Sequence, residues 1–218
     1  MVERMQLSLN DLKNCKDIIL DESPNIRRLK DNNILMLLNI FITNLTKSDC
    51  VIIDSCFTSI IFNLLYKNEY NNRNLKIFID NFIECKELLV LPLFYNLHWS
   101  LAIFIKSYNI LIYFDSIKNY HFTFIEKISD YLKENLFIKI YKIETINQKG
   151  YWECGYYLLM FFYLFLTIYN EFKSIDKKKL LNLIQIKCSY EKIDINTFIE
   201  SLLQIIEYYM DQELIFHY

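Results

Sequence analysis

Residues 148–162 read QKGYWECGYYLLMFF, and they contain both glycines of this 218-residue chain, Gly150 and Gly155. Glycine is used where φ must be positive or where another group comes very close, so the backbone around Cys154 has special geometry. The apolar run that follows, residues 156–169, has 14 residues, fewer than the roughly 20 that a membrane-spanning helix needs. This stretch therefore predicts a buried core helix that begins at Cys154, with no membrane insertion.

Cys154 has the position of a reactive thiol. A thiol attacks a carbonyl as the thiolate, and the positive end of a helix dipole stabilises that anion. The chain has six cysteines and no C-x-x-C pair, and its first residues lack the apolar core of a signal peptide. We therefore expect a reduced intracellular setting, in the cytoplasm, the nucleus or both. Zinc is not expected, because Cys50 and Cys56 lack a second ligand pair at the usual spacing.

A cysteine nucleophile needs a base, and the chain offers three histidines: His98, His121 and His217. His217 is the penultimate residue, and terminal residues are rarely held well enough for catalysis. His121 lies in a polar loop. His98 directly precedes Trp99 at the start of a predicted strand, so it is the candidate base.

Three apolar runs, residues 88–94, 98–105 and 110–114, are separated by short polar connectors and predict adjacent strands. Asp115 follows the third run. Antiparallel neighbours would bring its carboxylate near His98, where it could orient the imidazole and stabilise its cation. An ordinary strand-end aspartate remains the simpler interpretation of this residue taken alone.

Gln148 lies six residues before Cys154, in a loop that could fold back towards the nucleophile. Its side-chain amide and the backbone N–H of Cys154 would then both face a developing oxyanion. A solvated loop glutamine is the alternative.

The remaining pattern is helical at both ends of the chain. Asp31 is a candidate N-cap for a helix that ends near Thr46, and Ser55 could cap a second helix through Tyr66. The other expected elements are strands near 50–53 and 138–143 and helices near 122–137, 177–186 and 196–210. This order predicts one α+β domain over residues 1–218, with helices around a central mixed sheet.

These landmarks resemble a known family when they are taken together. The segments HWSLAIF, YFDS and QKGYWECGYY, in this order, are similar to the HW, DS and Q-x-x-x-x-D-C-G pattern of the Ulp/sentrin-specific proteases. These are papain-like, clan CE cysteine proteases of ubiquitin-like proteins. RLKDNNI at residues 28–34 also resembles the family's W-L-x-D-x-x-I motif. The resemblance covers about residues 8–170 and implies the papain-like fold of this family.

The resemblance also implies roles for residues outside the catalytic set. Trp99 would be the lid over a narrow tunnel for the Gly-Gly tail of a modifier, and Asp31 would contact the modifier's body. Gly155 would belong to the same substrate-binding set. Without the resemblance, Trp99 reads as a core residue and Asp31 as a helix cap.

Three positions depart from the family pattern: Arg28 replaces its Trp, Glu153 replaces the Asp before the nucleophile, and Gly150 stands where Asn is common. None of these changes removes a catalytic group. They bear on how the helix that begins near Asp31 packs and on substrate contacts near the nucleophile.

The resemblance implies a cysteine peptidase that processes or deconjugates SUMO or NEDD8 without a cofactor. The compact chain is similar in size to the small deneddylase branch. Ubiquitin is an alternative substrate, an acetyltransferase of the same clan an alternative enzyme, and a modifier-binding pseudoprotease the alternative without activity. The net charge of -2 gives no electrostatic reason to expect nucleic acid or an anionic membrane as partner. We also expect the protein to be a monomer.

Overall fold

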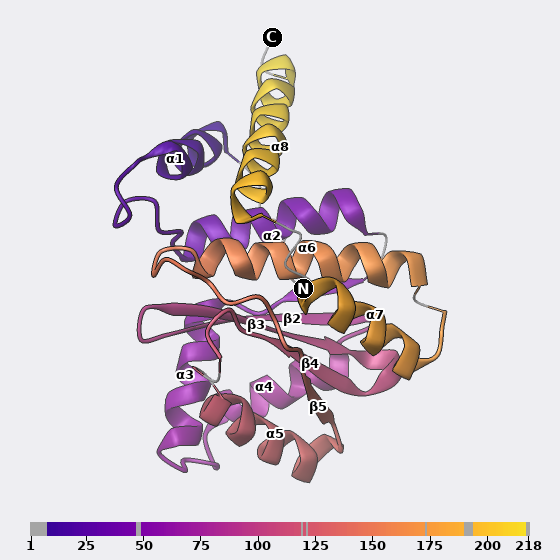
Figure 1. Cartoon of the computed structure of the whole chain (residues 1–218). Helices are drawn as coiled ribbons and strands as arrows, with labels where there is room; N and C mark the ends of the chain where they lie inside the picture. Colours follow the sequence, from indigo (N-terminus) through magenta and orange to yellow (C-terminus); the bar gives the residue numbers. More distant parts are fainter. Residues whose placement is uncertain are drawn as a thin grey trace.

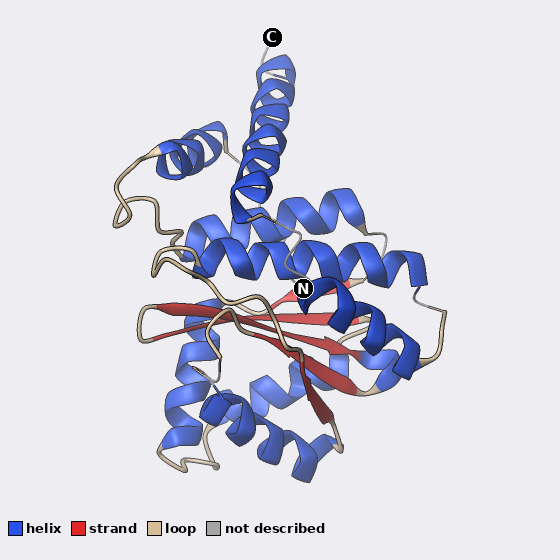
Figure 2. Ribbon diagram, viewed as in Figure 1, coloured by secondary structure: helices blue, strands red, loops and turns tan. Residues whose placement is uncertain are grey.

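The structure is a computed structural model that describes most of the chain, namely residues 8–46, 49–118, 120, 122–172, 174–189 and 194–216. In these residues a five-stranded mixed sheet lies between two layers of helices (Figure 2). This confirms the predicted α+β class with a central mixed sheet flanked by helices.

The strands lie side by side in chain order. They are β1 (Cys50–Ile52), β2 (Leu88–Tyr95), β3 (His98–Ile105), β4 (Ile110–Phe114) and β5 (Lys139–Lys142). The central strand β3 is antiparallel to both β2 and β4, whereas β1 and β5 run parallel to their neighbours. The three apolar runs of the sequence are adjacent strands, as predicted, and they form the centre of the sheet.

Both faces of the sheet are covered. All eight side chains of β3 are buried, but they alternate between two separate cores: Leu101 and Ile103 belong to one, and Ala102 and Phe104 to the other. Side chains of a strand alternate between faces, so a strand that is apolar throughout must have helices on both sides.

Two groups of helices supply this cover (Figure 1). One face carries α2 (Asp31–Leu45), α6 (Cys154–Phe172) and α7 (Lys177–Ser189), and the other carries α3 (Ser55–Tyr66), α4 (Arg73–Glu84) and α5 (Phe122–Leu136). The helices α1 (Leu9–Leu20) and α8 (Ile195–Phe216) pack against each other beyond α2 and α6, where Lys16 and Glu207 form an ion pair at 2.8 Å.

The predicted core helix is α6, and it begins at Cys154 as expected. Most of its 19 residues are buried. In the described part of the chain, no helix is both long and apolar enough to cross a membrane.

The predicted caps of two helices are wrong by one residue. Helix α2 begins at Asp31, whose neighbour Lys30 takes the N-cap position and donates its N–H to the Asn33 side chain at 3.1 Å. Helix α3 begins at Ser55, and its cap is Asp54. The carboxylate and hydroxyl expected to cap these helices instead bond to each other, since Ser55 Oγ donates to Asp31 Oδ1.

Two helices were not anticipated, α1 and α4. In α4 the buried residues Leu75, Phe78 and Phe82 lie three and four positions apart, which is the pattern of an amphipathic helix. The Asn-rich connector before α4 hid its start, although Asn72 is its N-cap. Helices α7 and α8 are present but extend further than predicted.

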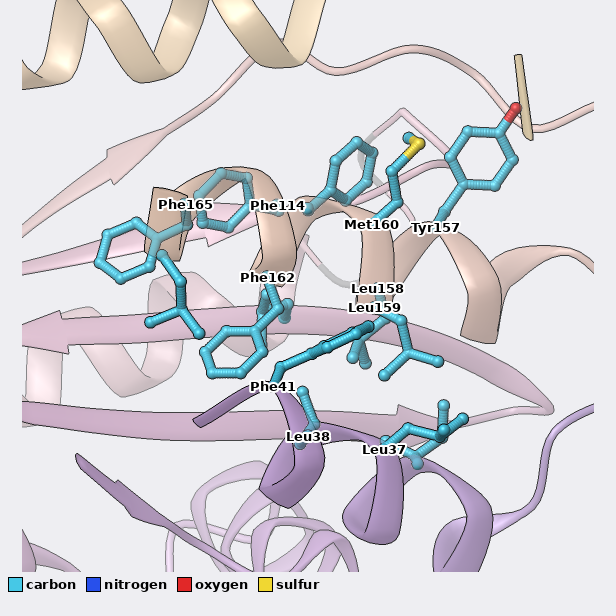
Figure 3. Packing of buried hydrophobic residues seen from close by; sticks show 14 of the residues in the cluster. Leu37, Leu38, Phe41, Phe114, Tyr157, Leu158, Leu159, Met160, Phe162 and Phe165 are labelled. Carbon is cyan, nitrogen blue, oxygen red and sulfur yellow. The ribbon is translucent and has the colours of Figure 1, made fainter. Parts of the chain in front are cut away.

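The core between α6, α2 and the sheet is rich in aromatic rings (Figure 3). Phe162 of α6 is fully buried, with Phe41 of α2 in the same cluster. Replacing a buried Phe by Ala removes apolar area and leaves a cavity.

We expect Phe162→Ala to lower the free energy of unfolding by about 3–5 kcal/mol, as measured by urea denaturation followed by circular dichroism. The matched control is Phe137→Ala, because the Phe137 side chain is 82% exposed. This control should change the free energy by about 0.5 kcal/mol or less. Equal losses in the two variants would show that α6 does not form the core.

Candidate active site

Three sequence-predicted residues meet at one edge of the sheet. His98 begins β3, Asp115 directly follows β4, and Cys154 is the first residue of α6. His98 Nε2 lies 2.6 Å from Asp115 Oδ1, and His98 also hydrogen-bonds with Cys154. All three side chains are buried, Cys154 completely. Since β3 and β4 are antiparallel, the start of one strand and the end of the other lie at the same edge.

Asp115 is held as a carboxylate by three donors. Its Oδ1 accepts the imidazole N–H of His98 and, at 2.9 Å, the backbone N–H of Ile117, while Oδ2 accepts the hydroxyl of Tyr113 at 2.5 Å. Burial alone would raise the pKa of Asp115, but these hydrogen bonds and the charge of His98 keep it below its ordinary value. The ionised form is therefore favoured at neutral pH.

The environment of His98 favours its cation. Burial alone would lower the pKa of this imidazole, but its bonds to Asp115 and Cys154 raise that pKa above the ordinary 6.5. Because a carboxylate can only accept, Nε2 carries the proton shared with Asp115, which leaves Nδ1 for the thiol. The Tyr120 ring packs edge-on against the imidazole, with ring centroids 4.7 Å apart. This geometry suits a base that takes a proton from sulfur.

The other cysteines lack this arrangement. Each of the six is a free thiol, and burial raises the pKa of Cys15 and of Cys188 to about 12. Burial also raises the pKa of Cys50 and of Cys85. Such thiols stay protonated and unreactive, whereas Cys154 has a histidine beside it.

Gln148 lies in the loop before α6, as predicted, and it is anchored at three points. Its N–H donates to Ser116 O at 2.9 Å, its Oε1 accepts the Ser116 hydroxyl at 2.6 Å, and its Nε2 donates to Gly150 O at 3.0 Å. The same Gly150 oxygen also accepts the N–H of Glu153 at 3.3 Å. The carboxamide nitrogen therefore lies at the turn that leads into Cys154.

Glu153 explains one departure from the family pattern. Its Oε2 accepts the N–H groups of Lys149 and Gly150, both at 2.9 Å. The side chain is nearly buried and fills the loop instead of pointing to solvent. A longer acid at this position thus serves to fasten the loop that carries Gln148.

The two glycines lie where other groups approach closely, and neither has a positive φ. A Cβ on Gly150 would come within 2.9 Å of the Trp152 indole nitrogen. A Cβ on Gly155 would come within 3.2 Å of the side chains of Leu29 and Ile34. The contacts described for Gly155 are thus with residues 28–34 of this chain, which we call the entry segment. The predicted part of Gly155 in substrate binding stays a prediction.

Trp99 is buried beside the same entry segment. Its indole N–H donates to Leu29 O at 3.2 Å, and its ring packs on Phe94 with centroids 4.6 Å apart. Leu29 therefore lies between the indole and the start of α6. At the departure position, Nη2 of Arg28 is buried without a hydrogen-bond partner among the described residues, while the neighbouring Arg27 stacks over Trp152 at 4.4 Å.

The predictions did not include Tyr113 and Ser116, both of which bond to candidate catalytic side chains. Ser116 was visible as the second letter of the DS pair, but Tyr113 reads as an ordinary strand residue. His121 and His217, the two rejected bases, lie outside the described residues. Among the described residues, no group of three or more His, Cys, Asp or Glu side chains could hold a metal.

The model of the Ulp1 protease family, C-terminal catalytic domain, matches residues 27–194. Among solved structures, a de-sumoylating protease is similar with a TM-score of 0.57 and 17% identity over 95% of this chain and 87% of that chain. The SUMO protease Ulp1 with its catalytic cysteine oxidized to a sulfonic acid gives 0.54 and 17%, over 96% and 88%. At this identity the two structures establish the fold. No curated protein sequence matches the chain.

The pairing of His98 with Asp115 predicts a pH effect. A raised pKa in the folded state means that the pair stabilises the fold below about pH 6.5, and that this contribution is lost as the pH rises through the pKa of His98. Asp115→Asn removes the carboxylate charge, so the titration midpoint of His98 should move to lower pH. The measurement is NMR of labelled imidazoles, with the His98 signal assigned by its absence in His98→Gln.

The control for this titration is Asp130→Asn on α5, because that carboxylate is exposed and forms an ion pair only with Lys133 among the described contacts. Its midpoint for His98 should equal that of the wild type. A midpoint that stays constant in Asp115→Asn as well would contradict the assigned pair.

Proposed function

This chain is a cysteine protease domain of the Ulp1 protease family, and we propose that it cleaves ubiquitin-like modifiers after their C-terminal Gly-Gly. The observation that carries the proposal is the hydrogen-bonded series of Cys154, His98 and Asp115 at the start of α6. The family supplies the reaction class, and the geometry assigns residues to its steps.

In the first step, His98 takes the proton of Cys154 and the thiolate attacks the carbonyl of the last glycine. The C–N bond breaks, the amine leaves with the proton from His98, and a thioester remains. Water then attacks this acyl-enzyme with His98 again as base, which releases the modifier's carboxylate and restores the thiol. Asp115 orients the imidazole and stabilises its cation throughout.

The tetrahedral intermediates carry a negative oxygen that needs donors. The backbone N–H of Cys154 lies at the N-terminus of α6, where N–H groups have no partner within the helix. The Gln148 carboxamide lies at the turn before it. We assign these two groups to the oxyanion, where preorganised donors contribute strongly to rate.

The confined approach to Cys154 supports a glycine tail as substrate. Cys154 and Trp99 are almost wholly buried, and Leu29 fills the space between the indole and the start of α6. We propose that a peptide reaches the buried sulfur through a narrow passage beside Trp99. Residues without side chains fit such a passage best, so we assign Trp99 to its cover and the Gly-Gly tail to its interior.

We propose SUMO and NEDD8 as the candidate modifiers. The two solved structures described above are SUMO proteases, which supports SUMO as the first candidate, and NEDD8 is the second candidate. Asp31 is proposed to contact the body of the modifier through the part of its carboxylate that Ser55 does not use.

The test uses SUMO, NEDD8 and ubiquitin that end in a thiol-reactive group. We expect one covalent adduct per chain, located on Cys154 by mass spectrometry, and no adduct with Cys154→Ala. The matched control is Cys56→Ala, which removes an exposed thiol and should leave labelling unchanged. If no modifier labels the wild type, the proposed substrate class is wrong; labelling that survives in Cys154→Ala would place the nucleophile elsewhere.

Gln148→Ala should lower the kcat of modifier-amide hydrolysis by about 100-fold or more, because it removes an oxyanion donor. The KM should change little, since this bond forms in the transition state. Steady-state kinetics on a fluorogenic modifier amide measure both constants. The neighbouring exposed residue provides the control: Asn147→Ala should retain the wild-type rate. A kcat that Gln148→Ala leaves unchanged would exclude the assigned donor.

A further inference from the structure

We propose that Ser116 is a positioning residue that fixes the carboxamide of Gln148 with its nitrogen directed towards the nucleophile. The inference rests on the proposed function, because it concerns the oxyanion donor of that reaction. It assigns a task to a residue that touches neither the thiol nor the imidazole in any described contact.

Ser116 forms two hydrogen bonds with Gln148. Its carbonyl oxygen accepts the Gln148 backbone N–H at 2.9 Å, and its hydroxyl donates to Gln148 Oε1 at 2.6 Å. Ser116 is 1% exposed and Gln148 is half-buried, so this short hydrogen bond is largely shielded from water. A glutamine side chain has three rotatable bonds, and fixing both its backbone and its tip removes most of that freedom before substrate arrives.

The orientation of the Gln148 carboxamide matters because its nitrogen and its oxygen are chemically different. The nitrogen can only donate and the oxygen can only accept, and only the nitrogen can stabilise an oxyanion. Gly150 O, which can only accept, bonds to Nε2, so the oxygen must point to Ser116 and the serine hydroxyl must be the donor. Turning the carboxamide over would place two oxygens against each other at Gly150.

The bond to Gly150 uses one of the two hydrogens on Nε2, and the second remains for the substrate. Gly150 O also accepts the N–H of Glu153, the residue before Cys154. The carboxamide nitrogen is thus tied to the turn that presents the thiol. Loss of the Ser116 hydroxyl would leave the oxygen end without its described donor, and the plane of the carboxamide could rotate.

The position of Ser116 in the chain gives this contact a further meaning. Asp115 orients His98, and the next residue, Ser116, orients the carboxamide of Gln148. Both residues directly follow β4, so the end of this strand orients both groups. The loops are also joined by the Thr145 hydroxyl, which donates to Asp115 O. Proton transfer and oxyanion binding are therefore aligned with each other by one strand end.

The experiment compares two reactions of Ser116→Ala. Hydrolysis of a modifier amide passes through an oxyanion, whereas alkylation of the thiol by a haloalkyl-terminated modifier does not. We expect kcat for hydrolysis to fall about 10- to 100-fold with little change in KM, since a displaced donor loses part of its effect. The alkylation rate should stay within about two-fold of the wild type. Equal falls in both rates would overturn the inference, because they would indicate damage to the base through Asp115.

The double variant separates a positioning role from a merely structural one. If Ser116 acts through Gln148, the combination of Ser116→Ala with Gln148→Ala should hydrolyse substrate at the rate of Gln148→Ala alone, within about two-fold. A further fall equal to that of the single Ser116→Ala variant would contradict the proposal. Urea denaturation of each variant identifies any loss of rate that comes from unfolding.

A measurement without substrate distinguishes failure of this inference from failure of the proposed function. In a spectrum of side-chain amides, assigned with Gln148→Ala, the Nε2 hydrogen of wild-type Gln148 that bonds to Gly150 O should exchange slowly, and Ser116→Ala should accelerate its exchange at least about ten-fold. An unchanged exchange rate overturns the positioning role whether or not any modifier is cleaved. Inactivity of the wild type towards all modifiers, with the exchange effect present, overturns the proposed substrate class alone.

Discussion

The buried carboxylate of Asp115 is the constraint on which the rest of the site depends. A charge taken out of water is costly unless hydrogen bonds replace its hydration, and Asp115 obtains them from His98, Tyr113 and Ile117. These donors come from three places: the start of β3, the end of β4 and the loop after it. Tyr113 and Ile117 lie within two residues of Asp115, whereas His98 reaches it because β3 and β4 pair antiparallel. The pairing of these two strands therefore determines the partner of the imidazole.

The thiol is held to the same edge by a different force. Helix α6 is apolar on nearly all sides, and its burial between α2 and the sheet fixes where its first residue lies. Gly155 allows this close packing, because any side chain there would press against Leu29 and Ile34. The hydrophobic effect therefore sets the position of Cys154, and hydrogen bonds set the position of its partners.

The departures from the family pattern lie in the loop before Cys154 and in the segment at residues 28–34, and the structure accommodates two of the three. Glu153 reaches two backbone N–H groups of the loop. Gly150 leaves room for the Trp152 indole, over which Arg27 stacks. Arg28, in contrast, keeps a buried nitrogen for which no described residue is a partner, and nothing in the fold explains it. The groups assigned to bond making and breaking are unaffected by these changes.

The local features could be predicted from the residues alone: the three central strands, the core helix that begins at Cys154, and the residue types and order of His98, Asp115 and Gln148. These follow from periodicity and from short patterns that local chemistry dictates. The sequence could not give the exact caps, because Asp31 and Ser55 satisfy each other across two helices. Nor could it distinguish a positive φ from a close approach at the glycines. Which distant groups meet, as Ser116 with Gln148 and Trp99 with Leu29, follows from the tertiary structure, because strand register and helix burial act between segments far apart in the chain.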